Sequence, residues 1–285
     1  MIQVIPAGEE EAIPSSGFFS IKKAAHGEED DQQTVPWIRI KESTGAYNTN
    51  SSNRPNSVSI MHQNIQCIRN KIIDLNIFLN TDLDNVDIVC FSEHWLNEHE
   101  YTSLVIPNYN LAGIYCRKVH KNGGVAILVK NSISFKNKPH TMFLNEELHF
   151  EHIVIELTIS KNNLLIVCLY RSPRGSIEIF LNKLEILLDN LGREGKTIVL
   201  CGDFNINFLI EHAAKENFLA ITKSFNLHPI ISTATRTTSF SQTCIDQIFA
   251  NITTGSFSSN NIDTGISDHN AIFFASIYSK PNNYQ

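Results

Sequence analysis

The chain has 285 residues, 42% of them hydrophobic, which is enough to bury a sizeable core in one large domain or two small ones. It contains no apolar run of the roughly 18 residues that a membrane-spanning helix needs, and no basic and then apolar stretch marks a secretory signal at its start. The net charge of −6 argues against a large basic surface, and the six cysteines form no C-x-x-C pair. We therefore expect an intracellular protein with buried thiols and no membrane partner.

Residues 1–57 differ in composition from the rest of the chain. The stretches "GEEDDQQT" and "STGAYNTNSSNRPNS" are polar and have little apolar periodicity. This composition predicts a poorly ordered N-terminal tail over residues 1–57, followed by one domain over residues 58–285.

From residue 58 onward, apolar runs alternate with turn signals. The runs "VSIMHQN", "VDIVCFSE" and "GGVAILVKN" are typical of strands, and helical spacing of apolar residues predicts a helix in "CIRNKIIDLNIFLNT". "HIVIELTIS" and "NNLLIVCLY" predict an antiparallel hairpin joined by "KNN". "SIEIFLNKLEILLDNLG" predicts an amphipathic helix with a glycine cap at its end. The strand "TIVLCG", a helix around "EHAAKENFLAITKSF" and the strands "CIDQIFAN" and "AIFFASIYS" follow. Hairpins mixed with helices, without a regular βαβ period, predict an α+β domain of stacked sheets with helices outside.

Polar residues stand at the ends of several of these predicted strands. They are Asn64, Glu93, Tyr170, Arg171, Asp203, Asn205, Asp268 and His269. If the strands pack into one sandwich, these residues can converge on a single edge and form a hard-cation site beside a titratable base. Each position alone also has an ordinary explanation, such as a helix cap for Asn64 or a turn for Asp203 and Asn205.

The words that contain these residues resemble a known family. "QNIQ", "FSEHWL", "GDFNIN", "CIDQIF" and "SDHNAI" occur in the order found in the endonuclease/exonuclease/phosphatase superfamily, which includes deoxyribonuclease I. "NIQCIRNKIIDL", "NGGVAILVK", "LYRSP" and "TATRTTSFSQTCIDQIFAN" are similar to the endonuclease domain of non-LTR (LINE-type) retrotransposons. The resemblance implies a four-layer α/β/β/α sandwich, in which two mainly antiparallel sheets lie between outer helices.

The resemblance also implies a metal-dependent phosphodiesterase. Glu93 and Asn64 match residues that bind Mg²⁺ in the family, with Asp268 beside the metal, and Mn²⁺ is a possible substitute. Asp203 matches the residue that orients or deprotonates the attacking water. Asn205 matches a donor to the phosphate oxygen on which charge grows in the transition state.

Further residues are matched to phosphate and DNA contacts. His269 corresponds to the residue that contacts the scissile phosphate, with Asp246 fixing its ring. Tyr170 and Arg171 would supply further donors to phosphate. A polar loop before "CIDQIF" and the cationic turn "RKVHKNGG" (117–124) are candidate DNA contacts. The loop residues considered are Thr235, Arg236 and Ser239.

The expected function is therefore Mg²⁺-dependent nicking of one DNA strand, as in target-site cleavage by a retrotransposon, with action in the nucleus. Gln66 stands where the repair branch often has Asp, and the retrotransposon branch tolerates Gln there. Since the chain ends soon after "SDHNAIFFASIYS", we expect no reverse transcriptase domain in it. An apurinic-type repair nuclease, another phosphoesterase of the same fold and a catalytically decayed DNA-binding fragment stay open as alternatives.

Overall fold

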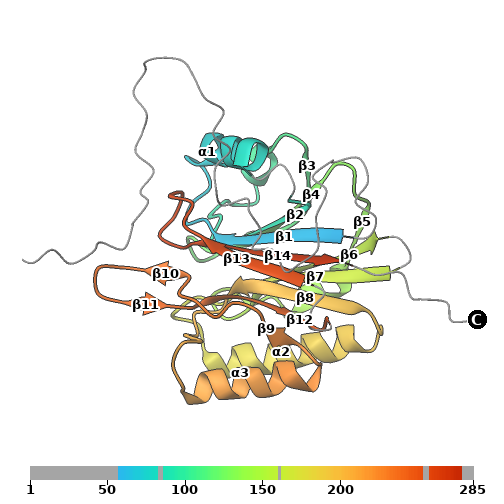
Figure 1. Cartoon of the computed structure of the whole chain (residues 1–285), viewed down its shortest axis with the longest axis vertical. Coiled ribbons are helices and arrows are strands. Elements are labelled where there is room, and N and C mark those ends of the chain that lie inside the picture. The colour runs from blue at the N-terminus through green and yellow to red at the C-terminus, as the bar shows by residue number, and fades with distance from the viewer. Residues whose placement is uncertain (1–56, 83–85, 160–161, 253–256, 278–285) are drawn as a thin grey trace, which may run out of the picture. The chain divides into compact units, whose positions relative to one another are not determined.

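Two six-stranded sheets form the centre of the structure, a computed structural model that describes residues 57–82, 86–159, 162–252 and 257–277 (Figure 1). The predicted tail, residues 1–57, lies outside these ranges except for Ser57, the first residue of strand β1.

The first sheet has the strand order β13-β14-β1-β2-β4-β3. Its strands span Phe257–Ile262, Ala271–Ile277, Ser57–Asn64, Ile88–Ser92, Val125–Lys130 and Tyr109–Tyr115 in that order. The second sheet has the order β5-β6-β7-β8-β12-β9. Its strands span Phe135–Asn137, Glu151–Ile159, Asn162–Tyr170, Thr197–Asp203, Asp246–Ala250 and His228–Pro229. A separate two-stranded hairpin consists of β10 (Arg236–Thr237) and β11 (Gln242–Thr243).

Helices cover the outer faces of the two sheets, as Figure 1 shows. Helix α1 (Ile72–Ile77), extended by a π-helical turn at Phe78–Asp82 (η2), packs on the first sheet. Helices α2 (Ile177–Gly192) and α3 (Ala213–Ser224) pack on the second. Short 3₁₀ turns occur at Tyr101–Ser103 (η3) and Pro139–Leu144 (η4). The predicted four-layer α/β/β/α sandwich is therefore present, and the predicted hairpin is the antiparallel pair β6–β7.

Three apolar clusters fill the spaces between these layers. One lies between the sheets, a second and phenylalanine-rich cluster lies under α2 and α3, and a third lies under α1. Strand β8 contributes to two of them, because successive side chains of a strand point to opposite faces. Val199 and Cys201 face the other sheet, whereas Ile198 and Leu200 face the helices. This two-sided burial explains the continuous apolar run "TIVLC".

Two helix expectations differ from the structure. Helix α1 begins only at Ile72, five residues after the start of the predicted helix, and its regular part is six residues long. Helix α2 does not end on a glycine cap: Gly192 is its last residue, and the C-cap is Arg193 in a right-handed conformation. A Cβ atom at Gly192 would lie 3.2 Å from the Phe225 ring, so close packing explains this glycine better than helix termination does.

Two parallel strand pairs determine where the polar strand ends meet. Among the described strands β1 pairs in parallel with β2, and β7 with β8, whereas the other pairs are antiparallel. The last residues of each pair are in register, Asn64 with Ser92 and Tyr170 with Asp203. Asp246, the first residue of β12, is in turn opposite Asp203. One edge of the sandwich therefore collects polar residues from both sheets.

Among the described residues, no helix combines the length and the apolarity that crossing a membrane would require.

Candidate active site

Asn64 joins two carboxylates at this edge. Its side-chain amide donates to Glu93 Oε1 at 2.9 Å and to Asp203 Oδ2 at 2.8 Å. The Tyr170 hydroxyl donates to the same Glu93 oxygen at 2.9 Å. Four residues at the ends of β1, β2, β7 and β8 thus form one hydrogen-bonded group that spans both sheets. Asn64 does not cap a helix, since α1 begins eight residues later.

The backbone around Glu93 is held in an unusual conformation. Glu93 and Trp95 have φ angles of 55° and 60°, a left-handed region that costs a non-glycine residue about 1–3 kcal/mol. Two hydrogen bonds hold them there, from Glu93 N to the carbonyl of Gly124 at 2.8 Å and from Trp95 N to that of Gly123 at 3.0 Å. Gly124 has φ of 86°, and a Cβ there would lie 2.4 Å from the His94 ring. The glycine pair of "NGGVAILVK" therefore positions the glutamate.

Asp203 is a buried carboxylate, with only 1% of the residue exposed. Burial, followed by repulsion from Asp246, raises the pKa of Asp203 to about 8. It stands at the end of β8 because Gly202 lets β7 and β8 approach closely: a Cβ at Gly202 would lie 1.8 Å from the Leu169 carbonyl oxygen. The other oxygen, Asp203 Oδ1, accepts from the backbone N–H of Asn205 at 3.0 Å. The side-chain amide of Asn205 donates to the Arg171 carbonyl at 2.7 Å.

Asp246 and His269 form a buried pair beside Asp203. His269 Nδ1 lies 2.8 Å from Asp246 Oδ2, and both residues are at most 2% exposed. Ligand atoms of Asp203, Asp246 and His269 all lie within 4.8 Å of one another. Burial lowers the pKa of His269, but the charge and hydrogen bond of Asp246 outweigh it and raise that pKa to about 9. Neutral pH therefore favours the imidazolium form.

Two residues expected to bind substrate are placed inside the protein instead. The Thr235 hydroxyl is fully buried and donates to Asp246 Oδ2 at 2.8 Å, so it supports the Asp246–His269 pair. Arg171 is 7% exposed. Its guanidinium donates to backbone carbonyls in the loops after β7 and β8, including that of Phe204 at 2.8 Å. Arg171 thus links the loops after β7 and β8, and its contact with a phosphate stays a prediction.

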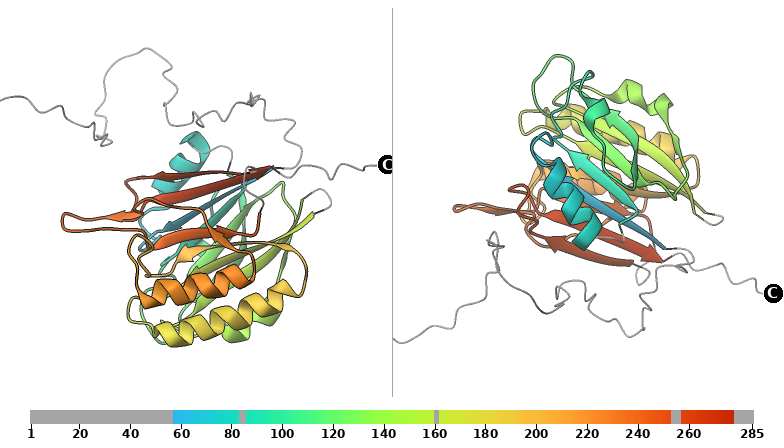
Figure 2. Two further views of the ribbon diagram at one scale, coloured as in Figure 1. Left: turned by 60° about the horizontal axis from the view of Figure 1, so that its bottom comes forward. Right: turned by 90° about the horizontal axis from the view of Figure 1, so that it is seen from above.

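The remaining predicted residues lie at the rim. Arg236 donates from two nitrogens to Asp268 Oδ2, at 2.9 and 2.7 Å. Asp268 Oδ1 lies 3.8 Å from His269 Nε2, so Asp268 adjoins the histidine and is 39% exposed at its side chain. Ser239 is exposed in the loop between β10 and β11, next to Phe240, which is 96% exposed. Figure 2 shows this hairpin extending beyond the two sheets.

Several supporting residues were not predicted from the sequence. Trp95 donates its indole N–H to Glu93 Oε2 at 3.0 Å. Gln63 donates to the His269 carbonyl at 3.0 Å, and the Ser267 hydroxyl donates to the Asn64 carbonyl at 2.7 Å. Trp95 lies within the "FSEHWL" motif, which was a signal for it. The other two link β1 to a loop about 200 positions later, and no local pattern reveals such a contact.

A buried ion pair lies behind Tyr170 and the glycine pair. Arg117 Nε donates to Glu151 Oε1 at 2.7 Å, and Gly124 N donates to Glu151 Oε2 at 2.7 Å. The Arg117 guanidinium also lies over the Tyr170 ring, 5.7 Å from its centroid. Arg117 and Glu151 therefore hold two of the elements that position Glu93. Two other cationic residues of the turn have acidic partners too, Lys118 with Glu98 and His120 with Glu147, which reduces its value as a phosphate-steering patch.

The donor set of the edge suits a hard divalent cation. Glu93, Asp203 and Asp246 bring three carboxylates close together, and no described lysine or arginine forms an ion pair with any of them. The hydrogen-bond donors to Glu93 are neutral groups, namely Asn64, Trp95 and Tyr170. Excess negative charge on oxygen ligands is the environment that Mg²⁺ and Mn²⁺ occupy. Glu93 and Asn64 are therefore suitable ligands for such a cation. Asp268 lies next to His269 at the same edge.

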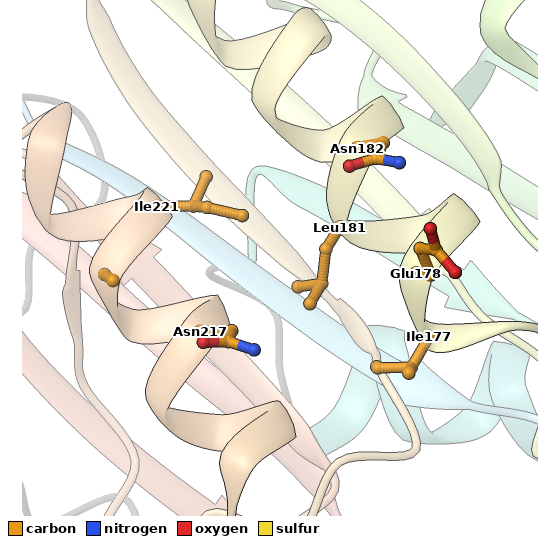
Figure 3. A pocket seen from close by; sticks show the side chains of 7 residues that line it. Ile177, Glu178, Leu181, Asn182, Asn217 and Ile221 are labelled. Carbon is orange, nitrogen blue, oxygen red and sulfur yellow. The ribbon is translucent and has the colours of Figure 1, made fainter.

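A groove elsewhere on the domain shares none of these residues. It encloses about 430 Å³ between α2 and α3 and is lined by side chains such as Leu181, Asn217 and Ile221 (Figure 3). It contains no cluster of catalytic residue types. The chemistry of the described residues is therefore concentrated at the sheet edge.

The model of the Endonuclease/Exonuclease/phosphatase family matches residues 45–269 of the chain. The chain belongs to this family. Its sandwich is the deoxyribonuclease I-like fold of the family, whose members are phosphodiesterases and nucleases that generally use divalent metal ions. No curated protein sequence is recognisably similar to the chain.

Solved structures of the same family share this fold at low sequence identity. The endonuclease domain of TRAS1, a telomere-specific non-LTR retrotransposon, superposes with a TM-score of 0.64 and 15% identity, covering 79% of this chain and 100% of that one. The AP endonuclease LMAP from Leishmania major gives 0.61 and 12%, covering 79% and 89%. TDP2 from D. rerio, complexed with a single-strand DNA product, gives 0.55 and 14%, covering 77% and 98%. These likenesses concern the fold of the family, whereas the choice of substrate depends on the site.

Proposed function

We propose that this family member is a Mg²⁺-dependent DNA endonuclease that nicks one strand by phosphodiester hydrolysis, as in retrotransposon target-site cleavage. One observation carries the proposal: the hydrogen-bonded group of Asn64, Glu93, Tyr170 and Asp203 lies against the buried Asp246–His269 pair. This arrangement offers a cation site, a base and a cationic phosphate contact within one edge.

In this proposal, the residues of the edge divide the work of hydrolysis. Glu93 and Asn64 hold the cation, which supplies charge stabilisation to the phosphate and lowers the pKa of nearby acids. Asp203, once ionised, accepts a proton from the attacking water. The Asn205 amide has a second N–H beyond the one donated to Arg171, and it is available to a phosphoryl oxygen.

His269 is the proposed contact to the scissile phosphate. Its Nδ1 is engaged by Asp246, which leaves Nε2 as the nitrogen for substrate. A protonated ring next to the phosphate offsets the negative charge that grows on oxygen in the transition state. Asp246 and Thr235 act through His269 by fixing its orientation.

DNA as the substrate is supported by the hairpin beside the edge. Asp268, next to His269, is bonded to Arg236 at the base of the hairpin, and Phe240 is exposed near its tip. An exposed aromatic ring with an arginine and hydroxyls on the same hairpin is typical of a surface that stacks on a base and contacts phosphates. Two of the similar structures support this choice, the endonuclease domain of TRAS1 and TDP2 complexed with a single-strand DNA product.

The test is nicking of supercoiled plasmid by the full-length protein, in Mg²⁺, in Mn²⁺ and in EDTA. We expect relaxed circles with either cation, none in EDTA, and a loss of at least about a thousandfold in rate for His269→Ala. Ile186→Ala is a control, because Ile186 is 47% exposed on α2, which supplies none of the residues of the edge. Folded protein that leaves the plasmid intact with both cations would overturn the proposal.

The apurinic-type alternative has one point in its favour, the likeness to an AP endonuclease in fold. A duplex oligonucleotide with one abasic site separates the two functions. Equal rates on abasic and intact duplexes indicate the retrotransposon-type nuclease, whereas cleavage only at the abasic site indicates the repair activity.

A further inference from the structure

A second cluster of metal-binding residue types lies in the core, one step below the active edge. The sulfur atoms of Cys90, Cys168 and Cys201 lie within 4.8 Å of one another, and all three residues are fully buried. They come from β2, β7 and β8 and therefore from both sheets. Together with His62, described next, we name this group the sulfur layer.

Strand register brings His62 to the same place. His62 is opposite Cys90 in the parallel pair β1–β2, and Cys168 is opposite Cys201 in the parallel pair β7–β8. Residues opposite each other on neighbouring strands point to the same face, so both pairs point into the space between the sheets. His62 thus lies on the same face of its sheet as Cys90, beside the three thiols, although its ring nitrogens are outside the 4.8 Å group that the sulfurs form.

The imidazole of His62 is not fully satisfied by the protein. It is completely buried, and its Nδ1 has no hydrogen-bond partner, the nearest acid oxygen being Asp246 Oδ1 at 4.0 Å. Its Nε2 lies 3.2 Å from the Ser92 hydroxyl. A buried polar nitrogen without a partner costs about 1–3 kcal/mol, so it calls for a compensating role.

We propose that the sulfur layer is a binding site for a thiophilic metal ion, with zinc as the ion that three sulfurs and one imidazole suit best. Tetrahedral zinc with Zn–S bonds of about 2.3 Å separates its sulfur ligands by about 3.8 Å. The sulfurs of the cluster are within 4.8 Å of each other, so adjustments of about 1 Å bring them to this spacing. His62 completes the site by turning a ring nitrogen toward the sulfurs.

Binding is balanced by proton release. The Cys168 and Cys201 sulfurs each lie 3.5 Å from a backbone carbonyl oxygen, those of Phe91 and Val167, to which a protonated thiol can donate. Uptake of one ion converts three thiols to thiolates and releases three protons, while neutral imidazole binds without losing one. Because the layer is fully buried, the ion enters as the sheets come together during folding.

The position gives the ion a structural role distinct from the oxygen-ligand edge. Each member of the layer stands two residues before a polar strand end: His62 before Asn64, Cys168 before Tyr170 and Cys201 before Asp203. Cys90 likewise precedes Ser92. An ion here would tie both parallel strand pairs together directly beneath the active edge.

The first test is metal analysis of the full-length protein, expressed in zinc-supplemented medium and freed of loosely bound ions. We expect about one zinc or copper ion per chain and a fall of at least about tenfold in the double variant C168A/C201A. Cys116→Ala is the matched control, because Cys116 is also buried but lies outside the cluster, and it should retain the metal. Folded protein without zinc or copper, or metal retained by the double variant, would overturn the proposal.

A second measurement does not depend on the folding of a variant. The wild-type chain is unfolded, reduced and refolded with Co²⁺, and a thiolate-to-cobalt charge-transfer band in the near ultraviolet is expected. Cobalt on the carboxylates of the active edge gives no such band, so refolded protein that lacks it contradicts the site. Neither readout uses nicking, and a negative nuclease assay leaves both tests unaffected.

Discussion

The acidic residues at the two ends of strand β8 have opposite surroundings: those at its start are paired with lysines, and the one at its end is buried near other acids. At its start, Lys196 lies 2.8 Å from Glu156 and 2.7 Å from Glu194, and Lys138 contacts the same two acids. Hydrogen bonds from the two lysines lower the pKa of Glu156 to about 2. At its end, Asp203 is buried among other acids, and its pKa is raised to about 8. The acids at the start of β8 are thus neutralised by lysines, whereas Asp203 at its end has no lysine or arginine partner among the described residues.

The difference separates charges that stabilise the fold from charges that serve chemistry. A paired carboxylate lowers the free energy of the folded state, whereas a buried carboxylate near other acids raises it. A protein tolerates the second arrangement where a bound cation or substrate compensates for it. If this interpretation of the two ends is right, substitutions at each should move stability and activity in opposite directions.

The largest expected effect comes from Asp203→Asn. Nicking should fall by at least about a thousandfold, because the base is lost while the shape is kept. In EDTA the melting temperature of the variant should improve relative to the wild type as pH increases from 4 to 8. The folded-state pKa is raised above the usual value of 3.8, so ionisation of Asp203 weakens the wild-type fold progressively over this range, and Asn removes that pH dependence. The hydrogen bond that Asn loses at one of the two donors to Asp203 is a constant offset. Calorimetry and the plasmid assay measure both changes. A difference in melting temperature that does not change with pH would break the comparison.

The second-largest effect is expected at Glu151, a buried acid near the active edge that is paired with Arg117. Glu151→Gln leaves the Arg117 guanidinium buried without its carboxylate, which typically costs about 3–5 kcal/mol of stability. Nicking should also fall below what the folded fraction explains, since Gly124 and Tyr170 lose their support. Urea unfolding and single-turnover nicking at low temperature measure the two effects.

Glu98→Gln is the control for this prediction. Glu98 pairs with Lys118 in the same turn, but both side chains are more than half exposed, and such pairs contribute at most about 1 kcal/mol. Equal losses in the two variants would mean that burial does not distinguish these pairs.

The sequence revealed the active edge better than it revealed its support. Asn64, Glu93 and Asp203 could be predicted because each ends an apolar run, and parallel pairing brings such ends to one edge. Arg117 and Glu151 could not, since their pairing depends on how β6 packs against a turn 34 positions earlier. Arg171 shows the same limit: its position at a strand end could be predicted, but its bonds to the carbonyls of two loops could not.

The strands and helices could be predicted where burial leaves a clear apolar pattern in the sequence. Strands such as β7 and β8 are buried on both faces, so their apolar runs stand out in the sequence. Helix α1 was overestimated at its start, because Cys67 has a positive φ of 74° and Ile68 is buried from a turn and not from a helix. The hairpin β10–β11 has two residues per strand, too few for any alternation to show.

At the paired end of β8, Glu156→Gln should destabilise the fold and leave nicking unchanged. The folded-state pKa of about 2 lies below the usual 4.5, so the contribution is present above pH 4.5 and disappears as pH falls toward 2. Its size is on the order of 1–3 kcal/mol, at about 1.4 kcal/mol for each unit of pKa. Urea unfolding at pH 7 and pH 3 should show a smaller difference between variant and wild type at pH 3. An equal difference at both pH values would assign the loss to packing and not to charge.

The smallest effect is expected for Phe240→Ala, which touches neither end of β8. Phe240 is 96% exposed, so its removal should leave the melting temperature unchanged, while loss of stacking on a base weakens DNA binding by roughly 1 kcal/mol, or about fivefold. Phe143→Ala is the matched control, because Phe143 is also highly exposed, at 72%, but lies on η4 and not on the hairpin. Fluorescence anisotropy with a labelled duplex in EDTA separates binding from cleavage. If both phenylalanine variants bind as tightly as the wild type, the hairpin is not a DNA contact, and the charge at the active edge alone must position the strand.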